Sequence, residues 1–536
     1  MTPAELLCSR ALVALVPCAE GVVMAAGSDD DDDACLPLAE LPLLQRFARR
    51  SDRVFVLDEG KPVLRWLLAR GVDVARPVCR VTLEIVAGGR VDETGQPLAP
   101  SRAVALQRAR DLLERLPGRM AAVDERSQRK VARLESLVLR PFAALEHRGL
   151  PIDKARWQVV VDEEKQAAAA ARQRVYELAG SHVPRDLFGQ ADINLDADAD
   201  VRGLLQRATG KALDDTSRST LAALGHPLAD ALLTFRESWK IVTTYGDALL
   251  AHVKDVDDDG VGRIRSTFVP LGASTGRVAC REPNLQNLPK DARFHACLRA
   301  PRGRSLVTAD YGTCELRIVA ELAEDPVFLA AFARGEDLHS TVAASMFGVP
   351  VSKTENPELR QRAKAINFGL VYGMGPAALS ASLRVDRAAG EELLARYFRT
   401  FPRVRDYLEG AVDVALKRGY SETVLGRRLF FNEATLKSNN ARGELSRIMK
   451  NMPIQGCSAD MTKLAMVRVH ERLLEETRGS AGLVNTVHDE LVVECDDVDG
   501  AVVSDIVRTE MEEAHRTLLK KVPPLVEIHC GPTWHH

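Results

Sequence analysis

The chain has 536 residues, enough for three or four domains at about 150 residues each. Hydrophobic residues make up 46% and charged residues 27%, which excludes a collagen-like, a wholly disordered or a disulfide-stapled small protein. Lys and Arg number 72 against 75 for Asp and Glu, so the net charge is −3. Any contact with nucleic acid must therefore come from a local basic patch. No apolar run is long enough to span a membrane, and we expect no membrane partner.

The first 125 residues mix short β-like runs, such as 54–57, with helical patterns, which predicts a small α/β domain. The apolar run 11–19 favours a buried strand over a signal peptide, because an acid, Glu5, precedes it. Five consecutive acids, Asp29–Asp33, predict a solvated loop. The chain contains no C-x-x-C pair, so its cysteines are interpreted as thiols of a reducing cytosol, and we expect a cytoplasmic protein.

The pattern becomes helical between about 130 and 255. Leu134, Leu137 and Val138 give one helix its apolar face, and 217–224 and 228–250 predict others. An acidic loop follows, then strands, a helix-rich stretch and strands again. Neither of the usual glycine-rich phosphate-binding loops is present.

Residues 305–312 predict a buried strand that ends with Asp310, and a helical pattern follows from Glu315 to Leu322. An aspartate at a strand end can hold a hard cation against a phosphate. Taken alone, however, the pattern favours an aspartate that caps the helix or turns the chain.

Residues 483–494 predict a β-hairpin, because apolar runs flank a polar His488-Asp489-Glu490 turn. An ordinary polar turn would give the same pattern. Alternatively, Asp310 and Asp489 on adjacent strands could hold two Mg²⁺ ions about 3.5–4 Å apart, which would clamp the oxygens of an in-line phosphoryl displacement.

Four side chains recur at intervals of four residues: Arg360, Lys364, Phe368 and Tyr372. On a helix they drift by only about 40° per step and share one face. Cations suit a triphosphate, and rings suit a base and sugar. The alternative is a helix edge with its cations snorkelling over a core.

Arg447, Asn451 and Gln455 repeat this spacing, although Pro453 should bend or end their helix. Amide side chains suit contacts to a sugar or to minor-groove edges. Ordinary polar residues at a helix end would look the same.

Together these residues resemble the family A DNA polymerases of the bacterial DNA polymerase I type. Asp310-Tyr311-x-x-x-Glu315-Leu316-Arg317 resembles motif A, the series from Arg360 to Gly373 resembles motif B, and His488-Asp489-Glu490 resembles motif C. Segments 274–277 and 282–287 look like the part that touches primer–template. The similarity covers roughly residues 130–536, and five motifs in the family's order are a specific signal.

The resemblance implies a mixed α/β and α+β multidomain fold: an RNase H-like domain followed by a right-hand polymerase with a helical thumb, an antiparallel-sheet palm and helical fingers. The implied boundaries are 1–128 for a degenerate 3′–5′ exonuclease-like domain, 129–255 for the thumb, 256–322 and 448–536 for the palm, and 323–447 for the fingers. A separate 5′-nuclease domain would need more residues than the chain has.

The family's residue roles carry over as follows. The resemblance implies two Mg²⁺ ions, replaceable by Mn²⁺, with the metal-binding residues Asp310, Tyr311 and Asp489. It implies the catalytic residues Asp310, Asp489 and, as a general acid, Lys364. It implies the nucleotide-binding residues Arg360, Lys364, Phe368, Tyr372, Glu315 and His488, with Glu315 excluding ribonucleotides. It implies the DNA-binding residues Arg236, Lys240, Arg277, Asn284, Gln286, Asn287, Arg447, Asn451, Gln455 and Glu490.

Some positions depart from the family's pattern. Gly312-Thr313-Cys314 replaces the usual Ser-Gln-Ile of motif A, Lys290-Asp291 stands where a Val-Arg pair is common, and Thr486 replaces a usual Gln. These departures put rate, fidelity and substrate tolerance in doubt. The exonuclease would need four carboxylates, yet no Asp-x-Glu precedes residue 130, and Asp58 and Asp124 can supply only two.

We therefore expect a monomeric, DNA-templated DNA polymerase without proofreading, with primer–template DNA and deoxynucleoside triphosphates as its partners. The alternatives are a non-catalytic DNA-binding relic and a two-metal nuclease or phosphatase. Cations such as Arg427, Arg428, Lys437, Arg442 and Lys450 outnumber acids in their stretch, which predicts a positive face and salt-sensitive DNA binding.

Overall fold

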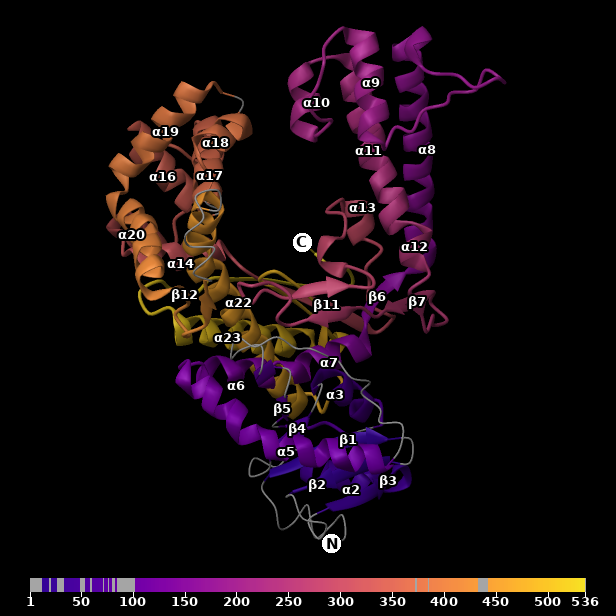
Figure 1. Cartoon of the computed structure of the whole chain (residues 1–536), viewed down its shortest axis with the longest axis vertical. Coiled ribbons are helices and arrows are strands. Elements are labelled where there is room, and N and C mark those ends of the chain that lie inside the picture. The colour runs from indigo at the N-terminus through magenta and orange to yellow at the C-terminus, as the bar shows by residue number, and fades with distance from the viewer. Residues whose placement is uncertain are drawn as a thin grey trace. The chain divides into compact units, whose positions relative to one another are not determined.

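The computed structural model describes residues 12–18, 21–26, 33–48, 54–57, 60–70, 72–75, 77–79, 82–83, 102–371, 374–383, 385–431 and 442–535. They fold as two compact units, which are described separately (Figure 1). Unit 1 consists of Met1–Gly149, Ser266–Gln286 and Ser305–Gly531. Unit 2 consists of Leu150–Arg265, Asn287–Arg304 and Pro532–His536.

Unit 1 begins with a five-stranded sheet in the order β3-β2-β1-β4-β5, in which β1, β2 and β3 are antiparallel and β4 and β5 run parallel to β1. The strands are β1 (Leu12–Cys18), β2 (Gly21–Ala25), β3 (Asp33–Pro37), β4 (Val54–Leu57) and β5 (Pro77–Cys79). The buried strand expected at 11–19 is confirmed as β1. Residues 29–32 of the acidic run lie outside the described residues, and Asp33 begins β3.

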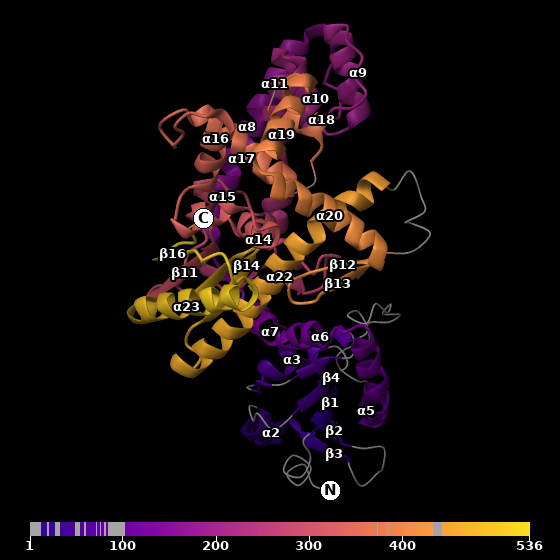
Figure 2. The same ribbon diagram turned by 90° about the vertical axis from the view of Figure 1, so that its left-hand side faces the viewer.

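Alternate residues of β1 enter different cores, as the two-residue period of a strand requires. Val13 and Leu15 pack with residues of α2 (Leu41–Ala48) and α3 (Gly60–Leu68). Ala14 and Val16 pack against α5 (Arg102–Glu125), which runs along the other face of the sheet (Figures 1 and 2). Both faces of this small sheet are therefore buried.

The helices α6 (Arg129–Leu137) and α7 (Leu139–Arg148) follow α5 in unit 1. The buried carboxylate of Glu146 on α7 accepts hydrogen bonds from Lys61 Nζ at 2.5 Å, Arg65 Nη1 at 2.9 Å and the Phe268 backbone N–H at 2.7 Å. One side chain therefore joins α3 to β9 (Thr267–Val269). The second unit begins at Leu150.

The second sheet of unit 1 has the order β14-β15-β11-β16. Its strands are β11 (Arg304–Tyr311), β14 (Gly482–Val487), β15 (Glu490–Asp496) and β16 (Val526–Gly531). The hairpin expected at 483–494 is confirmed by the antiparallel pairing of β14 and β15, with an irregularity between Leu483 and Asn485. The helices α22 (Arg442–Glu476) and α23 (Gly500–Leu518) lie side by side in both views (Figures 1 and 2).

The segment from 314 to 430 is mostly helical, and several of its helices begin at an aspartate cap. The side chains of Asp325, Asp337 and Asp386 accept hydrogen bonds from backbone N–H groups of the first turn. The helices are α14 (Cys314–Ala323), α15 (Pro326–Ala333), α16 (Leu338–Phe347), α17 (Pro357–Val371), α18 (Pro376–Leu383), α19 (Arg387–Thr400) and α20 (Pro402–Arg418). The hairpin of β12 (Tyr420–Glu422) and β13 (Arg428–Phe430) follows.

The helix α22 continues through Pro453, so the expectation that the helix could end at this residue is wrong. A proline removes the N–H that would bond the carbonyl four residues earlier, here that of Met449. The hydroxyl of Ser421 on β12 donates to this Met449 oxygen at 3.4 Å. A side chain from a neighbouring element therefore replaces the missing helical hydrogen bond.

Unit 2 is built on two long antiparallel helices, α8 (Lys154–Ala179) and α11 (Pro227–Tyr245). The helix expected at 228–250 is interrupted at Gly246, and α12 (Asp247–Leu250) continues it. The indole N–H of Trp157 donates to the Tyr245 carbonyl at 2.7 Å. The other elements are β6 (Leu150–Asp153), α9 (Asp198–Thr209), α10 (Arg218–Leu224), β7 (Val253–Lys254), β8 (Val261–Ile264) and α13 (Ala292–His295). No helix in the described part of the chain is apolar and long enough to cross a membrane.

Candidate active site

The two carboxylates singled out in the sequence lie in one cavity. Asp310 is on β11, the strand between β15 and β16, and Asp489 is in the turn that joins β14 to β15. Both line a cavity of about 330 Å³ in unit 1. Its other lining residues are Arg277, Tyr311, Thr313, Cys314, Glu315, Leu316, Phe368 and His488.

The Asp489 carboxyl is electrostatically disfavoured as an anion. Burial raises its pKa from 3.8 to about 6, and the neighbouring charge of Glu315 adds to this, whereas Arg277 opposes it. A hard divalent cation would favour the ionised form, and the site's carboxylates have the oxygen donors that Mg²⁺ prefers. Among the described residues, no three acidic, His or Cys side chains converge into a complete metal site. A cation here would take further ligands from substrate phosphates or water.

The turn after Asp310 is tightly held. The phenol of Tyr311 is buried and donates to the Met511 carbonyl at 2.7 Å, so only its backbone oxygen remains as a metal ligand. Thr313 has φ of +55°, which is unfavourable for a β-branched residue. A Cβ at Gly312 would lie 2.7 Å from Leu525 Cδ2, so a serine at this position would require the exposed Leu525 side chain to turn away.

Arg317, which belongs to motif A, stabilises the same turn. Its guanidinium donates to the Gly312 carbonyl at 2.8 Å and to the Pro523 carbonyl at 2.6 Å. It also lies over the Phe332 ring, 4.4 Å from the ring centroid. Burial lowers the pKa of Arg317 to about 10, which leaves it charged near neutral pH. The arginine therefore fixes the backbone that carries Asp310.

Arg277 and Glu315 form an ion pair beside the carboxylates. Both were predicted as site residues, one for DNA and one for the nucleotide sugar, and the structure brings them together. His488, the residue before Asp489, has φ of +54°, and Glu490 begins β15 as a buried residue.

Of the four residues predicted to share one face of a helix, Arg360, Lys364 and Phe368 lie on α17. Arg360 donates to both oxygens of Asp337, at 2.7 and 3.1 Å. Although burial raises the pKa of Asp337, hydrogen bonds from Arg360 and Ser340 bring it down to about 2. Lys364 is exposed, with its Nζ 6.0 Å from the Phe368 ring centroid. Tyr372 lies outside the described residues.

The buried residues that hold α17 in place were not predicted from the sequence. His339 Nδ1 and Asn367 Nδ2 are 3.1 Å apart, and the Tyr397 hydroxyl donates to Asn367 Oδ1 at 3.0 Å. Burial lowers the pKa of His339 to about 4, so this ring is neutral near pH 7. The helix-cap pattern of Asp337 and Ser340 is readable in the sequence, but the pairing with Arg360 has no local signal.

On α22, Arg447 is exposed, whereas Asn451 and Gln455 are half-buried. The Asn451 side-chain oxygen is buried and has no hydrogen-bond partner among the residues that the structure describes. The Gln286 amide donates to the Thr486 carbonyl at 3.3 Å, which places it beside the motif C hairpin.

Two further polar groups shape this part of the site. Asn284 Oδ1 accepts from the Gln286 N–H at 3.0 Å. Thr486, which departs from the family pattern, donates its hydroxyl to the Glu490 carbonyl at 3.0 Å across the hairpin.

The expectation that Arg427 and Arg428 belong to an exposed positive face is wrong. Arg427 is buried and binds Asp460 Oδ1 through Nε at 2.7 Å, and it also binds Glu135. Lys463 Nζ contacts Glu135 at 2.5 Å. Arg428 is mostly buried and bonds Glu422 at 2.7 Å. These cations are neutralised by acids that lie outside the basic stretch 427–450. Lys437 lies outside the described residues.

The buried cluster of Glu135, Arg427, Asp460 and Lys463 supports the segment that carries Arg277. A Cβ at Gly276, which has φ of +86°, would lie 2.7 Å from Arg427 Nε. The Arg427 side chain therefore lies against the backbone immediately before Arg277.

The sequence profile of DNA polymerase family A matches residues 158–536. The chain belongs to DNA polymerase family A. A solved structure of the polymerase domain of Pol1 from M. smegmatis, in complex with primer–template DNA and dNTP, is similar with a TM-score of 0.83 and 28% identity, over 100% of this chain and 98% of that one.

Curated relatives are also similar to this family A chain. DNA polymerase I of Caldicellulosiruptor bescii is 36% identical over 314 residues, which cover 58% of this chain and 36% of the relative. The thermostable DNA polymerase I of Thermus thermophilus is 33% identical over 449 residues, 81% of this chain and 51% of the relative. The chain spans about half the length, or less, of the curated relatives it matches.

In unit 2 of this polymerase-family chain, Arg236 faces inward. Its guanidinium donates to the Leu195 carbonyl at 3.3 Å and to the Thr216 carbonyl at 2.6 Å. Lys240, one turn later, is exposed. The Asn287 carbonyl accepts a hydrogen bond from the Tyr245 hydroxyl.

The two carboxylates considered for an exonuclease do not form a described site. Asp124 lies at the end of α5 and forms an exposed ion pair with Arg129. Asp58 lies outside the described residues. In unit 2, Asp291 of the departing Lys290-Asp291 pair caps α13, where its side chain accepts from the Arg293 N–H at 2.8 Å.

Proposed function

We propose that this chain is a DNA-templated DNA polymerase that adds deoxynucleotides to a primer 3′-hydroxyl with release of pyrophosphate, and that it lacks proofreading. The observation that carries the proposal is the single cavity that joins Asp310 and Asp489 to Arg277, Glu315 and Phe368. Membership of family A and the primer–template in the similar solved structure support the same activity.

Each side chain has a role that its chemistry allows. Arg360 and Lys364 would bind the triphosphate, and Lys364 is the candidate general acid for the leaving pyrophosphate. Phe368 would pack on the nucleotide sugar, and Glu315 would exclude a 2′-hydroxyl. Asp337 binds Nε and Nη2 of Arg360 in this structure, so a triphosphate would bind the remaining N–H groups of this guanidinium or displace Asp337.

A second set of residues is proposed to hold the nucleic acid. Arg277 would bind the primer end once it leaves Glu315, and the exposed Lys240 is better placed than Arg236 to meet a duplex backbone. The other proposed DNA contacts are Asn284, Gln286, Asn287, Arg447, Asn451, Gln455 and Glu490.

The donor set fits two divalent metal ions, which family A polymerases generally use. Asp310, Asp489 and the Tyr311 backbone carbonyl would hold them. When bound, the ions would promote ionisation of the primer hydroxyl and offset the charge of the leaving pyrophosphate. Asp489 is suited to this role because its ionisation is unfavourable in the protein alone.

The chain parts are proposed to correspond to a polymerase hand. The β14-β15-β11-β16 sheet would be the palm, the helices α15 to α20 the fingers, and α8 to α11 the thumb. The strand order β3-β2-β1-β4-β5, with one antiparallel side, supports an RNase H-like origin for the N-terminal sheet. This part would act as a structural support and not as a nuclease.

The alternative is a non-catalytic relic that binds primer–template. Two neighbouring carboxylates argue against it, because burying like charges costs free energy that DNA binding does not require. A nuclease or phosphatase built on the same acids is disfavoured by the α17 face, since hydrolysis needs no triphosphate site.

Primer extension with Mg²⁺ and four deoxynucleotides tests the proposal. The chain should extend a matched primer, and Asp489→Ala should abolish extension. The control Asp505→Ala, an exposed aspartate on α23, should extend normally. Matched and mismatched primers incubated without nucleotides should keep their length.

Each other result has a defined meaning. Primer shortening that survives Asp489→Ala would contradict the absence of proofreading. Absence of extension by the unaltered chain, with retained primer–template binding, would favour the relic.

A further inference from the structure

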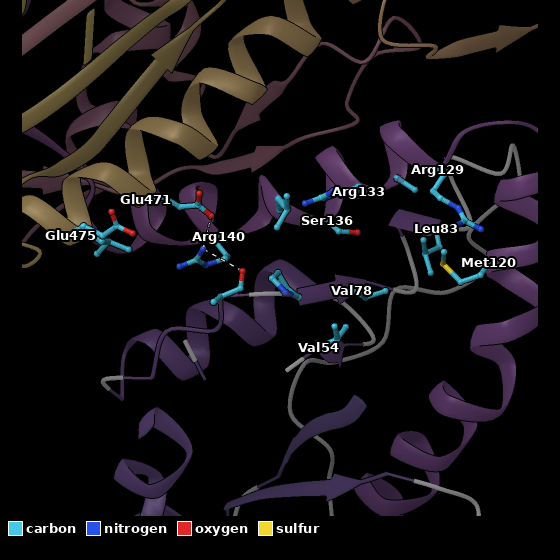
Figure 3. A pocket seen from close by; sticks show the side chains of 15 residues that line it. Val54, Val78, Leu83, Met120, Arg129, Arg133, Ser136, Arg140, Glu471 and Glu475 are labelled. Atoms are coloured by element: carbon cyan, nitrogen blue, oxygen red, sulfur yellow. Dashed lines mark hydrogen bonds and ion pairs between the residues drawn. The ribbon is translucent and has the colours of Figure 1, made fainter. Parts of the chain in front are cut away.

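A second cavity of unit 1, of about 880 Å³, lies away from the polymerase site (Figure 3). It is bounded by the first residues of β4 and β5, by α5 to α7 and by the last turns of α22. It shares no lining residue with the cavity of Asp310 and Asp489. Its lining residues are Val54, Ala75, Pro77, Val78, Leu83, Met120, Arg129, Ala132, Arg133, Ser136, Leu137, Arg140, Glu471, Leu474 and Glu475.

The charges in this cavity are separated by sign. Figure 3 shows Arg133 and Arg129 toward one side and Glu471 and Glu475 at the other, with Arg140 between them. Arg133 is exposed, and no acid pairs with it among the described residues. Among the described residues Arg129 is paired with Asp124, and this pair is exposed to solvent, where an ion pair is readily exchanged.

The acidic side of the cavity also has a carboxylate that could bind a ligand. Glu471 is 3.3 Å from Arg140 Nη1, so its charge is partly compensated. Glu475, one turn later on α22, is exposed and has no partner among the residues that the structure describes. The cavity therefore offers a cation at one end and an anion at the other.

The middle of the cavity is apolar and rigidly built. Arg140 is buried and held by Asp73, with Nη2 to Oδ2 at 3.1 Å, and by the Ala75 carbonyl at 3.3 Å. It is therefore a fixed part of the wall. Apolar groups also line the cavity: Val78 lies nearer its middle in Figure 3, whereas Leu83 and Met120 lie beside Arg129, and Leu137 and Leu474 complete the apolar lining. Its volume is within the range of about 300–1,000 Å³ typical of small-molecule sites.

We propose that this cavity is a second nucleotide site, which binds a nucleoside monophosphate whose base carries an exocyclic amine. The phosphate lies against the guanidinium group of Arg133, which matches its oxygens in bidentate geometry. The base lies between the apolar side chains, and its amine donates to Glu475. The inference does not depend on the polymerase activity, because binding at this cavity uses neither Asp310 nor Asp489.

The charge pattern selects this ligand over simpler ones. Inorganic phosphate would use Arg133 but leave the apolar middle and Glu475 unused. A nucleoside without phosphate would leave Arg133 unused. A nucleotide whose base has a carbonyl in place of the amine would bring an acceptor against the Glu475 carboxylate, which costs binding energy.

Calorimetric titration of the full chain in EDTA tests the proposal, with AMP, IMP, adenosine and inorganic phosphate as the probes. AMP is expected to bind at one site, about fivefold or more tightly than IMP and than phosphate. Arg133→Gln should weaken AMP binding about tenfold, as loss of a charge-assisted hydrogen bond implies. Glu475→Gln should reduce the preference for AMP over IMP. Both side chains are exposed, so neither variant should unfold the chain.

Two control variants locate the binding. Arg172→Gln replaces an exposed arginine of α8 and should leave the affinity for AMP unchanged. Lys364→Ala weakens the proposed triphosphate site and should also leave it unchanged. Loss of AMP binding in Lys364→Ala but not in Arg133→Gln would place the nucleotide in the polymerase site and overturn the proposal. Equal affinities for AMP, IMP and phosphate, or no AMP binding at millimolar concentration, would also overturn it.

Discussion

Replacement of Arg427 by methionine keeps much of the side-chain length but leaves two buried carboxylates without their main partner. Asp460 and Glu135 are both fully buried, and Asp460 would keep only the Thr423 hydroxyl, at 2.7 Å. Lys463 would remain on Glu135. Removing one partner of a buried ion pair typically costs about 3–5 kcal/mol. Unit 1 has roughly 400 residues, so this loss corresponds to a fall in Tm of about 4–6 °C.

Differential scanning fluorimetry at pH 7.5 measures this shift, and Arg516→Met is the matched control. Arg516 lies on α23 and pairs with Glu512 and Glu513 at the surface, where its loss should cost less than about 1 kcal/mol. A fall in Tm for Arg427→Met no larger than that for Arg516→Met would refute the assignment of Arg427 to a buried ion cluster. We also expect weaker primer binding in Arg427→Met, because the backbone at Gly276 rests on this side chain.

Four further outcomes are expected. The raised pKa of Asp489, about 6 against 3.8, costs stability that grows as pH rises between these two values, so without divalent cations Asp489→Asn should raise Tm by about 2–4 °C at pH 8, by about half as much at pH 5 and hardly at pH 3.5; equal shifts at pH 8 and pH 3.5 would contradict this. Gly312→Ser should cost less than about 1 kcal/mol in a urea titration, because the exposed Leu525 side chain that its Cβ would meet can turn away; a larger loss would show that this turn requires glycine. Primer–template affinity should fall steeply between 50 and 200 mM salt, as filter binding would show, and a flat dependence would exclude a basic contact surface. Phe368→Tyr should incorporate 3′-deoxy terminators more readily, because its hydroxyl can replace the missing sugar hydroxyl, and unchanged use would remove Phe368 from the sugar contact.

The sequence predicted the elements whose signals are local. The strand that ends near Asp310, the hairpin around Asp489 and the helix with Lys364 and Phe368 were all predictable, because their periodicity and turns lie within a few residues. The position of Asp489 in a turn between two apolar runs could be predicted without knowledge of the tertiary structure.

The rest depends on partners that are distant in the sequence. The burial of Arg427 could not be predicted, because Glu135 lies 292 residues away. The continuation of α22 through Pro453 is supported by a donor from Ser421 in another element. In both cases the local sequence identifies the type of residue, a cation or a helix-breaking proline. Its burial or its effect on the helix depends on a tertiary neighbour that is distant in the sequence.

Glu146 also has a consequence for expression of shortened forms of this protein. A fragment that starts at residue 129, the expected domain boundary, would lack Lys61 and Arg65 and leave this buried carboxylate with only the Phe268 N–H. Stripping the partners from a buried carboxylate costs several kcal/mol, a large share of the stability of any domain. The N-terminal part therefore stabilises the rest of unit 1, and a soluble shortened form would need Glu146 replaced together with the cut.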